Sequence, residues 1–220
     1  MIAQRGCLFA VAGVALLAAW ILSPAVRAVK EDAPAPVTEF HPDSAAKGAP
    51  PIDGPTWVLE SKLFTARMAL LEDEARLAFI EQRTGSRIDP FGDPGAGFLT
   101  FLLEIESRAH GSLVLQPQRC RLITNLKEFR HPVDMPTLES SYAHLEAVVP
   151  PAYRAIRPAL LDGEVVLESG GEVSGLLAYR GVKSNTRSFV VEVLVTTPDG
   201  ELAEFMVPYR RVKPGKKKGT

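Results

Sequence analysis

The chain has 220 residues, 46% of them hydrophobic, and a formal net charge of −1 at pH 7. This length and apolar content allow one good core to be buried. Of the 25 basic residues, two lie in residues 1–28 and six in residues 210–220, so residues 29–209 carry 17 basic against 26 acidic side chains. A mildly acidic folded part argues against binding to nucleic acid, which requires a basic face.

Residues 1–28 have the pattern of an export signal. Arg5 precedes an uncharged, apolar stretch over residues 6–26, and small residues suited to cleavage follow at 23–25 and 26–28. A basic start, an apolar centre and a small-x-small ending are typical of a secretory signal peptide. The alternative is an uncleaved membrane anchor, since the apolar stretch is just long enough to span a bilayer. Both interpretations place the rest of the chain outside the cytoplasm, in the periplasm or secreted.

Residues 29–56 are rich in proline and poor in large apolar side chains, which predicts an unfolded linker. The composition changes at Trp57, so we expect the folded domain over residues 57–211. A basic tail follows at 212–220. We expect it to be a solvated chain end, with adhesion to anionic surfaces as the alternative.

The domain is predicted to open with a strand over Leu63–Leu70, where alternate side chains are apolar. The next segment, Glu72–Gly85, has acids at its start, Arg83 near its end and a closing glycine, which indicates a short helix. The apolar residues on one face of this helix are Ala75, Ala78 and Phe79.

Phe98–Ser107 is predicted to be the central strand. Every second side chain from Leu99 to Ile105 is apolar, which indicates one fully buried face. The other face begins apolar and ends in two glutamates, so we expect it to be less buried. Segments of the same character that are expected to supply its partners are Glu172–Tyr179, Ser188–Thr196 and Leu202–Tyr209.

Shorter strands and one helical insertion complete the pattern. Residues 197–200, Thr-Pro-Asp-Gly, predict a hairpin between the last two strands. Residues 137–161 change to helical spacing, and we expect this insertion to cover the half-apolar face of the central strand. Further short strands are expected at Leu113–Leu115, Cys120–Thr124 and Val165–Leu167.

Many short strands with frequent turns predict a mainly β protein, an antiparallel β-sandwich. The central Phe-Leu-Thr-Phe-Leu-Leu-Glu-Ile strand, the glycine-containing segment Ser169–Tyr179 and the closing hairpin resemble the telokin-like, immunoglobulin-like domains of bacterial secreted proteins and lipoproteins of unassigned function. The resemblance covers about Leu63–Arg211. It implies an immunoglobulin-like sandwich and an extracytoplasmic location, with no catalytic residues to carry over.

The candidate reactive residues are scattered and predict neither catalysis, a metal site nor a cofactor. His110, His131 and His144 share no ligand-like spacing. Cys120 alternates with charged residues as an inward-facing strand position does, so we expect a buried, inert thiol. No nucleophile elbow surrounds Ser174, and no phosphate-binding glycine loop is present.

The best candidate for binding is the turn-rich loop Asp89–Gly97, because loops on a rigid scaffold carry function more often than strands do. Phe91, flanked by Asp89 and Asp93, is a candidate recognition anchor. The alternative is that Phe91 folds back as a plug over the end of the core. Together these features predict an exported, non-catalytic protein that binds a protein or another cell-envelope component. The alternative function is an extracytoplasmic small-molecule or metal-binding module.

Overall fold

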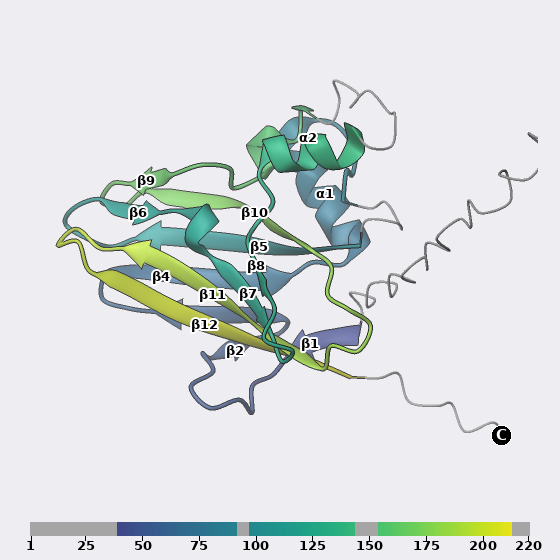
Figure 1. Ribbon diagram of the computed structural model, residues 1–220. Coiled ribbons are helices and arrows are strands. Elements are labelled where there is room, and N and C mark those ends of the chain that lie inside the picture. Colours follow the sequence, from purple (N-terminus) through teal and green to yellow (C-terminus); the bar gives the residue numbers. More distant parts are fainter. Residues whose placement is uncertain (1–38, 92–96, 144–153, 213–220) are drawn as a thin grey trace, which may run out of the picture. The chain divides into compact units, whose positions relative to one another are not determined.

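Two antiparallel sheets pack face to face in the computed structural model, which describes residues 39–91, 97–143 and 154–212 (Figure 1). The β11 sheet has seven strands in the order β1 (Phe40–Pro42), β12 (Leu202–Arg211), β11 (Ser188–Thr196), β6 (Leu113–Leu115) and β9 (Val165–Leu167), with β7 (Arg121–Thr124) beside β11 and β8 (Phe129–Arg130) beside β7. The β5 sheet has five strands in the order β10 (Glu172–Arg180), β5 (Phe98–Ser107), β4 (Phe64–Leu70), β3 (Thr56–Glu60) and β2 (Ile52–Asp53). The prediction of a mainly β sandwich is confirmed.

Strand β5 is central, as predicted, and pairs with β10 on one side and β4 on the other. The prediction that β11 and β12 also supply partners in its own sheet is wrong, because both belong to the facing sheet. Their apolar pattern is the same in either sheet, so periodicity alone does not assign them. The hairpin between β11 and β12 is confirmed, and Gly200 in its turn has a positive φ of 83°.

The core between the sheets is rich in aromatic rings. Phe101 of β5 lies 5.7 Å from Tyr179, 6.0 Å from Phe189 and 5.4 Å from Tyr209, measured between ring centroids. Trp57 of β3 meets Tyr209 edge to face at 6.4 Å. These contacts join strands of both sheets, so they fix one sheet on the other.

A second core covers the outer face of the β5 sheet. It is built from helix α1 (Asp73–Thr84), helix α2 (Met135–Ala143) and the 3-10 turn η3 (Arg157–Ala159). Leu138 of α2 and Phe98 of β5 are both buried in it. Thr100 of β5 is also fully buried, so the expectation of a less buried face is wrong at that position. It is confirmed for the end of the strand, where Glu104 and Glu106 are exposed. Residues 144–153 of the predicted insertion lie outside the described residues.

Helix α1 buries only part of the face that its apolar residues predict. Phe79 packs against the second core, but Ala75 and Ala78 are exposed, whereas Arg76 and Ile80 are buried. Arg76 tolerates burial because its guanidinium is paired with Asp89 across 2.7 Å. The helix ends at Gly85, whose φ of 69° is readily adopted by glycine.

The folded domain begins before residue 57, so the predicted linker is wrong for residues 39–56. Strand β1 pairs with the end of β12, and Phe40 is buried 4.9 Å from the ring of Phe189. Strand β2 pairs with β3. The leader, residues 29–38 and residues 213–220 of the predicted tail lie outside the described residues. Among the helices that are described, none is long and apolar enough to cross a membrane.

The two faces of β5 predict opposite effects of substitution on stability. Phe101→Ala removes a ring from the core between the sheets and should lower the free energy of unfolding by about 3–5 kcal/mol. Thr100→Val keeps the side-chain shape and removes a buried hydroxyl that has no hydrogen-bond partner among the described residues, so it should raise stability by about 1 kcal/mol. Urea denaturation of both variants measures this. A large loss of stability in Thr100→Val contradicts the burial of an unpartnered hydroxyl.

Candidate functional site

Strand β12, near one edge of the β11 sheet, has no strand partner on its outer side over more than half of its length, among the residues that the structure describes. Strand β12 pairs with β11 from Leu202 to Arg210, but it pairs with β1 only from Tyr209 to Arg211. Leu202–Val207 therefore has no strand partner on its outer side within the described part of the chain. We call this segment the β12 edge.

The edge strand β10 of the β5 sheet, by contrast, is covered by other parts of the chain. Along β10, the N–H of Val133 donates to the C=O of Ala178 at 2.7 Å, and the N–H of Leu161 donates to the C=O of Leu176 at 2.9 Å. The connection that carries α2 and η3 thus covers the β10 edge. Native proteins usually protect edge strands in this way, because unpaired backbone groups are a template for another strand.

Backbone hydrogen bonds at the far end of β12 establish which residues direct their backbone groups outward. The C=O of Pro208 accepts a hydrogen bond from Asp43 at 2.9 Å, and the N–H of Val212 donates to Glu39 at 2.8 Å, both on the β1 side. The direction alternates along an antiparallel strand. The residues of the β12 edge that direct their N–H and C=O groups outward are therefore Leu202, Glu204 and Met206.

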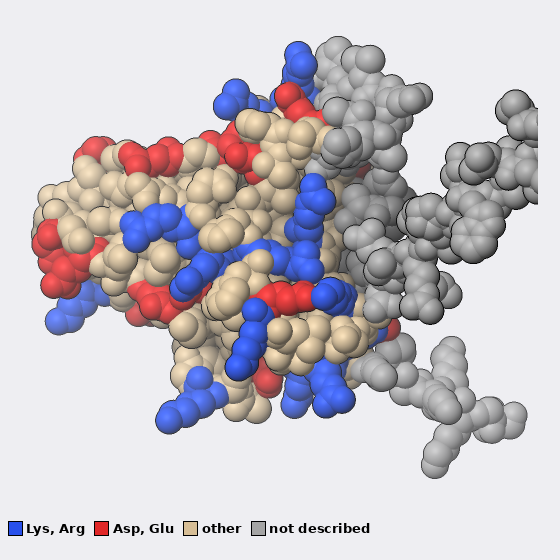
Figure 2. All heavy atoms as spheres, in the orientation of Figure 1, with Lys and Arg blue, Asp and Glu red and all other residues tan. Residues whose placement is uncertain are grey.

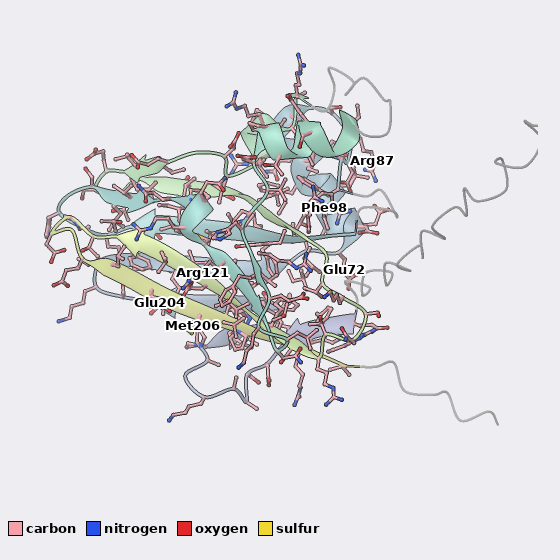
Figure 3. The ribbon with its side chains drawn as sticks, viewed as in Figure 1. Glu72, Arg87, Phe98, Arg121, Glu204 and Met206 are labelled. Carbon is pink, nitrogen blue, oxygen red and sulfur yellow. The ribbon has the colours of Figure 1, made fainter. Side chains whose placement is uncertain are left out.

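The side chains of these same residues are exposed on the outer face of the sheet. Leu202 is 50% exposed and Met206 is 48% exposed, while Phe205 and Val207, on either side of Met206, point into the core. Figure 3 shows Glu204 and Met206 on the front strands of this view, close to Arg121. The β12 edge thus combines outward backbone groups with two exposed apolar side chains around an acid.

A charged cluster crosses the outer face from β7 to β12. The Nε and Nη2 atoms of Arg121 (β7) both donate hydrogen bonds to the carboxylate of Glu192 (β11), and the Nη2–Oε1 distance is 2.7 Å. This hydrogen bond lowers the pKa of the nearly buried Glu192. Partial desolvation, and then the hydrogen bond shared with Glu192, raises the pKa of Glu204. Glu204 is the acidic residue of this cluster that lies on the β12 edge.

Further apolar side chains lie on the same sheet away from the edge. Phe129 of β8 is 60% exposed, and its ring lies 6.0 Å from the guanidinium carbon of Arg121. Val166 of β9 is also exposed. These side chains make the outer face mixed in character, so exposure of apolar groups alone does not single out the edge; the outward backbone groups do.

The predicted binding residues lie elsewhere, at the second core. Asp89 accepts two hydrogen bonds from Arg76, at 2.8 and 2.7 Å, and one from the N–H of Phe91 at 2.9 Å. Phe91 is buried, with its ring 5.4 Å from that of Phe98. It is therefore not an exposed anchor, and its position fits the plug interpretation. Asp93 lies outside the described residues.

The residues considered for chemistry stay apart. Cys120 is fully buried, and burial raises the pKa of its thiol to about 11, so the reactive thiolate is scarce at neutral pH. Within the three described ranges, no group of three or more His, Cys, Asp or Glu side chains is arranged to hold a metal ion. His144 lies outside those ranges.

Comparison with known proteins adds no relative to this picture. No protein-family model matches the chain, and no curated protein matches it. The surface is therefore interpreted from its own geometry.

The role of Asp89 predicts a difference between two aspartates that both lie near Arg76. Asp89→Asn leaves a buried guanidinium without its main counter-charge and should destabilise the fold by about 3 kcal/mol. Asp73→Asn should change stability by less than about 0.5 kcal/mol, because the Asp73 side chain is 83% exposed although it lies 3.0 Å from Arg76. Thermal and urea unfolding compare the two variants. Equal effects would show that Arg76 does not depend on Asp89.

Proposed function

We propose that this protein is an exported, non-catalytic β-sandwich that binds a partner protein by accepting an extended segment of that partner along the β12 edge. The immunoglobulin-like character of the sandwich, which the sequence resemblance implies, belongs to the same proposal. The observation that carries it is the outer side of Leu202–Val207, which pairs with no strand in the described part of the chain.

The backbone geometry supports strand addition over side-chain docking alone. Three successive outward residues of β12 present N–H and C=O groups at the spacing that another extended chain matches. Alternate side chains of the added strand would then lie beside Leu202 and Met206 on the outer face. Backbone hydrogen bonds would supply affinity, and these side-chain contacts would supply selectivity.

Charge favours a basic partner segment over a second copy of the chain. Asp199 and Glu201 are exposed in the turn before β12, and Glu204 is exposed on the β12 edge. Antiparallel pairing of two β12 edges about Glu204 would bring the acids of the two copies close together, and like charges on neighbouring strands are unfavourable. We therefore infer that the incoming strand carries Lys or Arg near Glu204 and apolar residues at the flanking positions of the same face.

Export follows from the amino-acid pattern of residues 1–28. We expect protein recovered from the producing cell to begin near Val26 or Val29, since these follow the two cleavage sites. Intact-mass measurement of the extracytoplasmic fraction tests this. A dominant form that begins at Met1 and resists extraction from membranes would replace the signal peptide with an anchor.

The strand-addition proposal is tested at Met206. Met206→Pro removes an N–H that faces outward, so the ladder with β11 should stay intact while an added strand loses a hydrogen bond and meets the proline ring. A photo-crosslinking residue at Leu202 first captures the partner in the producing cell. The affinity of the purified partner for Met206→Pro should fall by about tenfold or more.

Phe129→Ala is the matched control, because it alters an exposed apolar side chain of the same sheet away from the edge. It should bind the partner like the unaltered protein. Equal binding by Met206→Pro, with an unchanged melting temperature, rejects strand addition. A crosslinked product of twice the mass of the chain replaces the proposed partner with a second copy.

A further inference from the structure

A hollow of about 320 Å³ lies where the 3-10 turn η2 (Pro117–Arg119), strand β8, the start of α2 and the end of β10 meet. Buried Val133 contributes to its apolar lining. The polar side chains around it are Gln118, Arg130, His131, Thr137 and Arg180. We call it the arginine pocket.

Arg130 enters the pocket from the sandwich side of the sheet. It lies opposite Leu122 of β7, whose side chain is in the core, so both residues point to the same side of the β11 sheet. Its Nη2 atom is 3.3 Å from Glu128. Its Nε atom is buried and has no hydrogen-bond partner among the described residues. A buried, unpartnered N–H of a cation is costly, and an anion offsets that cost.

The acid beside Arg130 does not cancel the positive charge. Glu128 is also paired with Lys183 at 2.5 Å, and the hydrogen bond from Lys183 is the main cause of its lowered pKa. One carboxylate is thus shared by two cations. Asp134, the next acid along the chain, accepts the N–H of Thr137 at 2.8 Å and caps α2.

His131 lines the pocket with its imidazole ring. Its Nδ1 lies 3.0 Å from the carbonyl oxygen of Gln118, which requires Nδ1–H to donate. This hydrogen bond joins the segment that follows β8 to η2 and holds the ring in the wall of the pocket.

Basic side chains are frequent on this face of the molecule. Lys and Arg side chains gather across the middle of the face in Figure 2, although residues 29–209 are acidic in total. The exposed basic residues nearest the pocket in the chain are Arg119, Lys127, Lys183 and Arg187. A concave site among like charges raises the local concentration of counter-ions.

We infer that the arginine pocket binds a small oxyanion, a phosphate or a carboxylate. The planar guanidinium of Arg130 presents its donors in a fork that matches two oxygens of such an anion. Arg180, at the end of β10, also lines the pocket. The volume accommodates the anionic group with a short substituent over the apolar lining. This site is independent of the β12 edge, since it uses other strands.

Amide NMR spectra of the mature protein, titrated separately with sodium phosphate and sodium acetate, test the inference. Sodium chloride holds the ionic strength constant. We expect saturable shifts centred on Arg130, His131 and Arg180, with a dissociation constant in the millimolar range or tighter. Whether phosphate or acetate saturates first identifies the anionic group. Shifts that are linear in both anions, or that chloride reproduces, overturn the site.

Variants separate the pocket from general surface charge. Arg130→Gln should weaken binding by about tenfold or more, whereas Arg187→Gln, which removes one exposed charge outside the pocket, should change it by less than about twofold. Arg130→Lys keeps the charge and loses the fork, so its affinity should be intermediate. Equal binding by all three variants rejects the role of Arg130. If Arg130→Gln fails to fold, the comparison of Arg130→Lys with Arg187→Gln carries the test. Met206→Pro should bind the anion normally, which keeps this test separate from that of strand addition.

Discussion

Burial of the inner face of β5 and of the first half of its outer face is the constraint on which the rest of the structure depends. Its inner face packs on the β11 sheet through Phe101, and its outer face packs on α1, α2 and η3 through Phe98 and Thr100. A strand buried on both sides must be flanked by strands and covered by a further layer. The helical connections therefore lie over the β5 sheet, and the outer face of the β11 sheet is left to solvent.

This asymmetry determines which sheet edges have no strand partner among the described residues. The connection that covers the β5 sheet also closes the β10 edge through Val133 and Leu161. On the β11 sheet, β1 is only three residues long and ends at Pro42, where the chain turns away. The β12 edge is open because β1 is short. The arginine pocket lies beside the covered β10 edge, where β8 and the start of α2 meet the end of β10.

The sequence predicted those features that depend on neighbouring residues. Alternation identified β5, and the Thr-Pro-Asp-Gly turn identified the β11–β12 hairpin. Features that depend on distant partners were missed. Phe40 lies among prolines but packs on Phe189, and Arg76 is buried because Asp89, thirteen residues later, neutralises it. The β12 edge and the arginine pocket belong to this second class. An apolar alternation over Leu202–Val207 indicates a strand, but only the length of β1 makes it an edge.

The order of the strands separates opposite charges on a chain whose net charge is close to zero. On the outer face, Glu204 of β12 and Glu192 of β11 are followed by Arg121 of β7, whereas β12 itself ends in Arg210 and Arg211. The Arg121–Glu192 pair lies at the change of sign and is internally neutral. In the strand addition proposed above, Glu204 would attract the basic residue of the incoming segment, and Arg210 and Arg211 would repel it from the other end of β12. Charge would determine where along β12 an added strand lies, and backbone hydrogen bonds would determine its register. The exposed apolar side chains of the sheet are spread over Phe129, Val166 and Met206, and by themselves they would permit several modes of docking. The charges would favour one of these modes.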